Sequence, residues 1–188
     1  MKRRTLLRTT GGLLAVSAGG CLGSTGNGET GATPSPIDLG GQKRDDRGGM
    51  VIGYHGGPNG QIFYASHAPA DHGNPARFHT LVFGLFPYLF EHESMGWEAT
   101  AIYATDYSTV EFDLGEDGRL PAPLAAETFA DATAMTYVMG SEAAGGMGPT
   151  LVPFSAPTDA DSFTATHGGR TVTFDEVTPD LIADYSSR

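Results

Sequence analysis

Two glycine-rich turns constrain the fold of this chain more than any other feature. The turns, residues 56–60 and 145–149, each separate two short apolar segments of the kind that forms strands. Each pair is followed by a segment with helical spacing and then by another strand-like segment. The order strand, strand, helix, strand therefore occurs twice. It predicts an α+β fold of two related modules, although few residues match between the halves.

The boundaries of the expected elements come from apolar spacing. In the first module we expect strands over 50–54 and 61–66, a helix over 76–92 and a strand over 99–107. The second module has expected strands over 133–139 and 150–154, a helix over 158–167 capped by Thr158, and a strand over 170–176. A short terminal helix is expected over 179–185. Pro87 lacks an N–H group and should kink the first helix or end its first segment.

The N-terminus has the features of an export signal. Arg3 and Arg4 precede a short apolar run at 13–18, which is too short to cross a membrane. A twin-arginine start is typical of a route that exports folded proteins. Small residues precede Cys21 as in lipoprotein signals, although an ordinary signal with a chance cysteine is the alternative. We expect residues 1–20 to be a signal and lipidated Cys21 to anchor the protein to the outer face of the cytoplasmic membrane.

Composition sets the remaining domain limits. Residues 21–42 are rich in Gly, Ser, Thr and Pro and predict a flexible tether, followed by modules over 43–115 and 116–188. The charged cluster at 43–47 is interpreted as a solvated turn.

The charge balance excludes several classes of partner. The chain has 22 acidic and 11 basic residues, and four of the basic residues precede Cys21. Such an acidic protein is repelled by nucleic acid and by anionic membrane surfaces. The low lysine content with many Asp and Glu is typical of proteins adapted to high salt, where screening removes self-repulsion. The membrane contact that we expect is the lipid anchor.

Cys21 is the only cysteine of the chain. A disulfide within the chain, a cysteine zinc site and a catalytic Cys-His pair in the folded part are therefore excluded. The sequence also lacks the Gly-x-Ser-x-Gly, His-Glu-x-x-His and Walker motifs. Without a catalytic signature, we do not expect an enzyme.

Methionine and histidine near the two glycine-rich turns are the candidate metal ligands. Met50 and His55 lie in the stretch 48–64, and Met147 lies in the second turn. Thioether sulfur and imidazole nitrogen suit Cu(I). Two of these residues have clear alternatives. Met50 is either a buried core residue or a metal ligand, and the ring of His55 points either to a metal or to water. His79 is interpreted as a half-buried histidine with satisfied hydrogen bonds.

Three motifs in order resemble the NosL family of lipoprotein accessory factors of nitrous oxide reductase. They comprise Gly49-Met50, His55, Gly57-Pro58 and Gly60-Gln61-Ile62-Phe63; Tyr137-Val138-Met139-Gly140-Ser141, Gly146-Met147-Gly148 and Val152-Pro153-Phe154-Ser155; and His167-Gly168-Gly169-Arg170 with Phe174-Asp175-Glu176. The resemblance covers roughly residues 48–178. It implies two related modules similar to part of organomercurial lyase.

The resemblance also implies a function. A family member would be a copper(I) chaperone that supplies the copper–sulfur centre of nitrous oxide reductase, with that enzyme or its assembly complex as partner. Met50, His55 and Met147 would be the metal ligands. The family commonly has a cysteine two residues before the first-motif methionine, where this chain has Gly48. Three readings follow: a Cu(I)-binding protein without thiolate, a metal-free scaffold of the same machinery, and a lyase-like enzyme whose required cysteines are absent.

Overall fold

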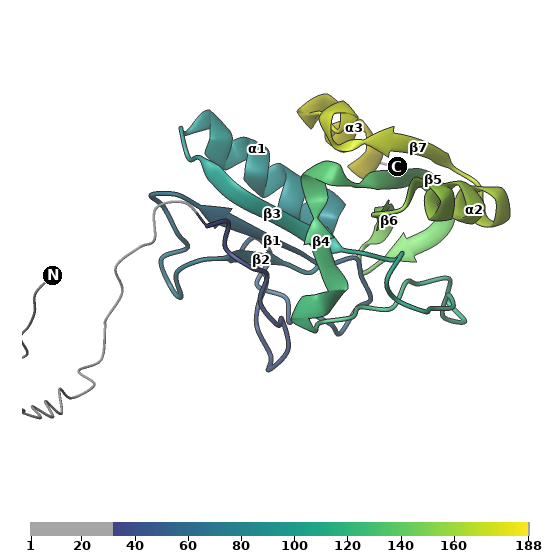
Figure 1. Ribbon diagram of the computed structural model, residues 1–188, viewed down its shortest axis with the longest axis horizontal. Coiled ribbons are helices and arrows are strands. Elements are labelled where there is room, and N and C mark those ends of the chain that lie inside the picture. Colours follow the sequence, from purple (N-terminus) through teal and green to yellow (C-terminus); the bar gives the residue numbers. More distant parts are fainter. Residues whose placement is uncertain (1–31, 188) are drawn as a thin grey trace, which may run out of the picture. The chain divides into compact units, whose positions relative to one another are not determined.

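Two antiparallel sheets carry the fold in the computed structural model, which describes residues 32–187 (Figure 1). The first sheet has, in spatial order, β2 (Ala76–Phe78), β1 (Gly60–Tyr64), β3 (Ala99–Thr105) and β4 (Phe129–Asp131). The second has β6 (Gly148–Phe154), β5 (Thr136–Gly145) and β7 (Arg170–Thr173). In each sheet, the first strand of the module (β1 or β5) pairs on one side with the next strand of the chain (β2 or β6). On its other side it pairs with the strand that follows the helix (β3 or β7). The predicted α+β fold with two strand-strand-helix-strand modules is confirmed.

Three α-helices complete these modules. A π-helical turn, Leu81–Leu85, leads into α1 (Phe86–Ser94), and α2 (Pro157–His167) and α3 (Pro179–Ser186) follow β6 and β7. Three short 3₁₀ turns occupy Ala126–Thr128, Ala132–Ala134 and Phe174–Glu176. Among residues 32–187, no helix has both the length and the apolar character needed to cross a membrane.

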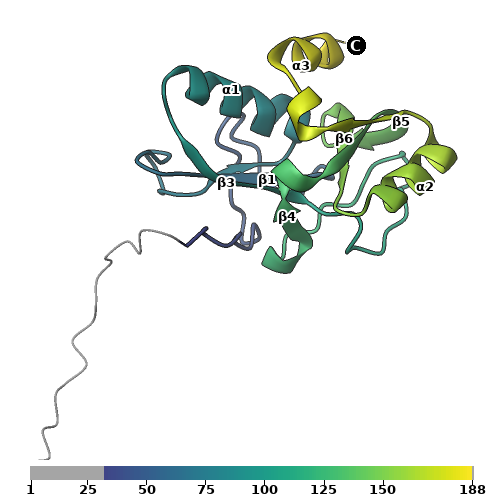
Figure 2. The same ribbon diagram turned by 45° about the horizontal axis from the view of Figure 1, so that its top comes forward.

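One core joins the two sheets. Helices α1 and α3 lie on the same side of the molecule (Figure 2). Ile62 from β1, Leu89 from α1, Tyr137 from β5 and Ile182 from α3 belong to a single buried cluster. Side chains alternate across a strand, so Val138 points to the opposite face of β5 and packs in a second cluster with residues of α2. The second sheet therefore has apolar packing on both faces.

The first expected strand, residues 50–54, is wrong. Val51 makes one isolated bridge to Arg44, and the chain then turns at Gly53, whose φ of +95° is accessible mainly to glycine. Ile52 is buried, but Tyr54 is 70% exposed, so the segment lacks the continuous buried face that a strand of a packed sheet has. The strand pair of the first module is β1 and β2 instead.

The long expected helix, residues 76–92, starts later than predicted. Phe78 does point into the core, but it does so from strand β2. Just after this strand, His79 N–H donates to the carboxylate of Asp45 at 2.8 Å. The helical hydrogen bonds begin when Leu85 N–H donates to Thr80 C=O. Pro87 lies at the start of α1, where the π-helical turn ends, in agreement with the prediction.

Smaller boundaries also differ. The strand expected at 133–139 begins at Thr136 because residues 132–134 form a 3₁₀ turn capped by Asp131. Helix α2 begins at Pro157 with Ala156 as its N-cap, so Thr158 does not cap it. Strand β4 was not expected; it belongs to the first sheet although it lies beyond residue 115, the limit expected for the first module.

The tether expected over 21–42 is wrong for its last residues. Leu39 is fully buried, and Ile37 exchanges two hydrogen bonds with the side-chain amide of Gln61, at 2.9 and 2.8 Å. Gln61 lies in β1, so residues 37–39 cover the face of the first sheet that is opposite α1. The expected signal at 1–20, Cys21 and the first part of the tether lie outside the described residues.

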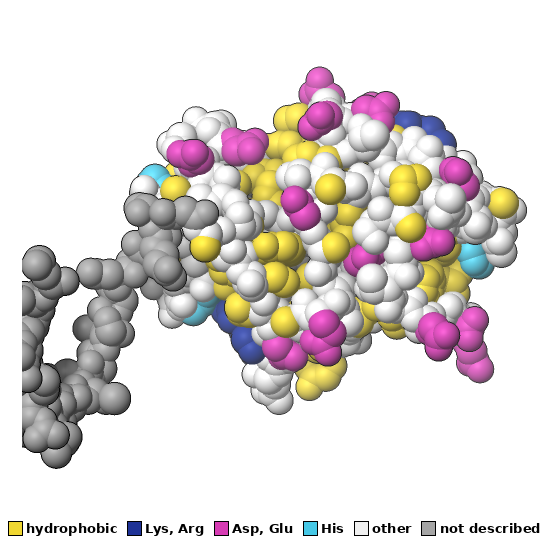
Figure 3. Space-filling view, viewed as in Figure 1, with side chains coloured by type: hydrophobic (Ala, Val, Ile, Leu, Met, Phe, Trp, Pro, Cys, Tyr) yellow, Lys and Arg dark blue, Asp and Glu magenta, His cyan; other side chains and the backbone are white. Residues whose placement is uncertain are grey.

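Acidic groups are spread over the surface. In Figure 3, Asp and Glu side chains occupy many separate places on the visible face, whereas Lys and Arg gather near its edges. No single acidic patch dominates this face.

Candidate metal centre

Met50 stands at the end of a tight turn that Asp45 holds together. One carboxylate oxygen of Asp45 accepts hydrogen bonds from the N–H groups of Arg47 and Gly48, at 2.8 and 2.7 Å. The backbone closes the turn because Asp45 N–H donates to Met50 C=O at 2.8 Å. Gly49 has a φ of +68°, which a glycine adopts without strain. The turn presents Met50 to solvent with 38% of its surface exposed.

The other carboxylate oxygen of Asp45 binds His79. It lies 2.7 Å from His79 Nδ1 and 2.8 Å from the His79 backbone nitrogen. Both residues are only 3% exposed. Burial by itself raises the pKa of Asp45, but the hydrogen bonds from His79 and Gly48 outweigh it and hold the pKa below its usual value. Asp45 is therefore a buried carboxylate anion, which corrects the interpretation of residues 43–47 as a solvated turn.

Gly48 separates Met50 from His79. A Cβ atom built on Gly48 would lie 3.9 Å from Met50 Cγ and 4.0 Å from His79 Cε1. The side chains of Met50 and His79 thus flank the position that a side chain at residue 48 would occupy. His79 was interpreted from the sequence as a histidine with satisfied hydrogen bonds, but its Nε2 is buried without a hydrogen-bond partner among the described residues.

The structure brings the turn of His55 against the turn of Met147. A Cβ atom on Gly146 would lie 3.1 Å from the carbonyl oxygen and 3.2 Å from Cβ of His55. A Cβ atom on Gly145 would lie 3.0 Å from the carbonyl oxygen of Gly57. The two glycines therefore allow the β5–β6 turn to approach the first motif closely. His55 is exposed, and Met147 is 54% exposed.

The predicted ligands thus fall into two groups in the contacts seen here. Met50 lies beside Gly48 and His79, and His55 lies beside the turn that carries Met147. Four residues of chain separate Met50 from His55, so both groups belong to the same glycine-rich stretch. In residues 32–187, no group of three or more His, Cys, Asp or Glu side chains is placed to hold a metal ion. Donors that include methionine sulfur remain the candidates.

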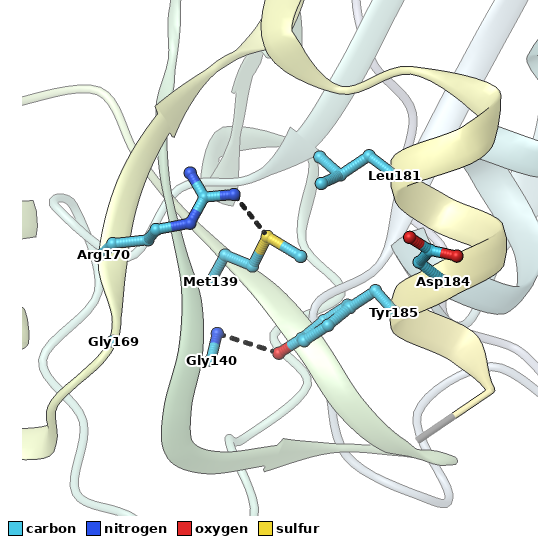
Figure 4. A pocket seen from close by; sticks show the side chains of 7 residues that line it. All are labelled: Met139, Gly140, Gly169, Arg170, Leu181, Asp184 and Tyr185. Carbon is cyan, nitrogen blue, oxygen red and sulfur yellow. Dashed lines mark hydrogen bonds between the residues drawn. The ribbon is translucent and has the colours of Figure 1, made fainter.

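A pocket of about 360 Å³ lies elsewhere, between β5, β7 and α3 (Figure 4). Arg170 donates to the sulfur of Met139 at 3.5 Å, and Gly140 N–H donates to the hydroxyl of Tyr185 at 2.9 Å. Met139 is 7% exposed and belongs to the core. Its sulfur already accepts a hydrogen bond, so this pocket adds no free donor to the candidate centre.

Comparison with known proteins identifies the family. The model of the family described as NosL matches residues 36–182. The chain belongs to the NosL family.

Two similar proteins bear the same family name. One curated relative is the copper-binding lipoprotein NosL of Stutzerimonas stutzeri, which is 30% identical over 86 residues. That match covers 46% of this chain and 40% of the relative, so it spans less than half of either protein. The crystal structure of the copper chaperone NosL from Shewanella denitrificans superimposes with a TM-score of 0.64 and 23% identity, over 79% of this chain and 98% of that one. It confirms the fold.

Proposed function

We propose that this NosL protein is a copper(I)-binding accessory protein without catalytic activity of its own. The observation that carries the proposal is the exposure of two methionines, Met50 and Met147, in glycine-rich turns. A methionine in a soluble protein normally fills a core. These two side chains are partly open to solvent, where a soft cation and a receiving protein can both approach them.

The proposed ligands are Met50, His55 and Met147, together with any further donor that the fold places beside them. Neutral thioether and imidazole donors leave the charge of Cu(I) unchanged. A site of this kind binds Cu(I) less tightly than one with a thiolate and releases it more readily by ligand exchange.

We further propose that the copper is delivered for the copper–sulfur centre of nitrous oxide reductase, through that enzyme or its assembly complex. The lipid on Cys21 would hold the protein at the outer face of the cytoplasmic membrane. Family membership and the lipoprotein name of the relative support this assignment.

A second candidate function is a metal-free docking module of the same machinery. Gly48 favours it, since this chain lacks the cysteine that the family commonly has at that position. The two functions are distinguished by measuring whether the Met147→Ala variant still binds copper and still binds the assembly complex. A copper protein should lose copper binding and keep docking in this variant, whereas a metal-free module has no copper binding to lose.

The direct test is an anaerobic titration of the protein with Cu(I) against a chromogenic chelator. We expect one equivalent of Cu(I) to bind, and Met50→Ala and Met147→Ala to weaken that binding. Met95→Ala is the matched control, because Met95 is 56% exposed and lies outside both turns. No binding at any chelator strength would refute the copper proposal.

A further inference from the structure

His79 has a ring nitrogen whose role the fold does not explain. Its Nδ1 and its backbone N–H both lie within hydrogen-bond distance of one oxygen of Asp45. Its Nε2 is buried and has no hydrogen-bond partner among the described residues. Buried polar atoms in native proteins are nearly always paired, so an unpaired one in a residue that is 3% exposed requires a reason.

The hydrogen bond to Asp45 fixes which nitrogen is free to bind. An ionised carboxylate only accepts hydrogen bonds, so Nδ1 of His79 carries the proton in this contact. In the neutral ring, Nε2 then holds an unshared electron pair. This tautomer is assigned from the hydrogen bond. A carboxylate, a histidine oriented by it and an open nitrogen together form the arrangement that metal-binding histidines commonly have.

The ring of His79 lies near the same glycine as the exposed Met50. Cε1, the ring carbon bonded to Nε2, lies 4.0 Å from the Cβ position of Gly48, and Met50 Cγ lies 3.9 Å from the same point. Gly48 is itself exposed and has no side chain to fill the space between them. The side chain of Met50 and the ring of His79 therefore both approach the position where a residue-48 side chain would begin.

We propose that His79 Nε2 and Met50 Sδ bind Cu(I) together at the position of the missing residue-48 side chain. The inference rests on the proposed copper function and adds a ligand to it. Asp45 is the positioning residue, because it touches the metal only through His79. An imidazole and a thioether are donors that Cu(I) accepts.

The charges of the site are consistent with this assignment. With Gly48 in place of a cysteine, no thiolate offsets the charge of Cu(I). The buried carboxylate of Asp45 supplies one negative charge on the far side of the imidazole ring. The group formed by Asp45, His79 and Cu(I) is then neutral overall, which removes much of the cost of placing a cation beside buried groups.

His72 offers a matched comparison within the same region. It also pairs with an aspartate, since its Nε2 lies 2.7 Å from Asp46 Oδ1. Its other nitrogen, Nδ1, lies 2.8 Å from the carbonyl oxygen of Gly73. Both ring nitrogens of His72 are therefore occupied, and this histidine should take no part in copper binding.

The test is ¹⁵N NMR of the unmodified protein with labelled histidine during anaerobic addition of Cu(I). We expect one equivalent to shift the Nε2 signal of His79 and to leave the ring signals of His72 unchanged. Bound Cu(I) with an unchanged His79 ring would overturn this inference and leave the proposed function standing. No bound Cu(I) at all would overturn both.

The chelator titration tests the same assignment with two histidine variants. His79→Gln should lower the affinity for Cu(I) by about tenfold or more, and His72→Gln should leave it unchanged. Circular dichroism of each variant shows whether it is folded. A folded His79→Gln protein with unchanged affinity would refute the assignment of Nε2, as would an equal loss in both variants. If His79→Gln does not fold, the NMR experiment on the unmodified protein decides.

Discussion

The carboxylate of Asp45 and the ring of His79 form a buried pair, 2.7 Å apart, that joins two segments separated by 34 residues. Asp45 also holds the turn that ends at Met50, so one side chain positions both an exposed methionine and a buried imidazole. The candidate copper site in this NosL protein therefore depends on a residue that is not itself a ligand.

Asp45→Ala should destabilise the protein by about 3–5 kcal/mol, because it leaves the partners of a buried anion unpaired. Urea unfolding of the metal-free protein measures this change. Asp117→Ala is the control: Asp117 lies in an exposed ion pair with Arg119, and its removal should change the free energy of unfolding by less than about 0.5 kcal/mol. Similar values for the two variants would contradict the structural role of Asp45.

Gly48→Cys should raise the affinity for Cu(I) by about tenfold or more, equivalent to about 1.4 kcal/mol, since a thiolate is a softer donor than imidazole or thioether. A Cβ atom at residue 48 meets its nearest neighbour, Asp45 Oδ1, at 3.7 Å, so the side chain fits. Gly48→Ser has similar size without sulfur and serves as the control in the chelator titration. If both variants bind alike, the space at Gly48 is not part of the site.

Gly146→Ala should weaken Cu(I) binding if His55 and Met147 act together. Its new methyl group would lie 3.1–3.2 Å from His55, closer than ordinary contact, and would push the two turns apart. Gly140 lies in β5 with a φ of +78° and nothing within 4 Å of an added Cβ atom, so Gly140→Ala introduces backbone strain without a new contact. Titration of both variants with Cu(I) compares the effects; equal affinities would show that the approach of the two turns is unimportant.

Leu39→Ala should cost about 2–5 kcal/mol of stability, as expected for a large side chain removed from a core. Leu39 is fully buried against the first sheet. Asp38→Ala changes an exposed neighbour and is the control. The midpoints of urea unfolding should separate the two clearly; a neutral Leu39→Ala would mean that residues 37–39 do not belong to the stable fold.

Salt should raise the midpoint of thermal unfolding. The chain carries a net charge of −11, and its acidic groups repel one another across the surface. Most of the gain should come below about 1 M KCl, where the screening length is already near 3 Å. Sucrose stabilises proteins without screening charge and provides the control. A midpoint that does not respond to KCl would argue against adaptation to high salt.

The sequence predicted the parts of this fold that depend on local pattern. Apolar spacing located the π-helical turn and α1 through Leu81, Leu85 and Leu89, and it located β3 and α2 to within two residues at each end. It misplaced the first strand because Val51 and Ile52 look like strand residues, whereas the positive φ of Gly53 turns the chain away. It missed β4, whose pairing with β3 has no local signal.

Only the part of the candidate site that depends on local sequence pattern could be predicted. Methionines in glycine-rich turns can be recognised along the chain, but the exposure of Met50 is known only from the structure. The pair of Asp45 and His79 cannot, because its members lie far apart and the free state of Nε2 depends on the folded surroundings. A single aspartate among the charges at residues 43–47 gives no sign that it is buried.

X-ray absorption at the copper edge, on protein loaded anaerobically with one equivalent of Cu(I), tests the central claim most directly. The claim is that methionine sulfur and histidine nitrogen hold Cu(I) in a folded part that contains no cysteine. The spectrum should show both sulfur and imidazole scatterers around a monovalent copper, and the sulfur contribution should fall in Met50→Ala. Copper surrounded only by oxygen and nitrogen, or a spectrum unchanged by Met50→Ala, would contradict it.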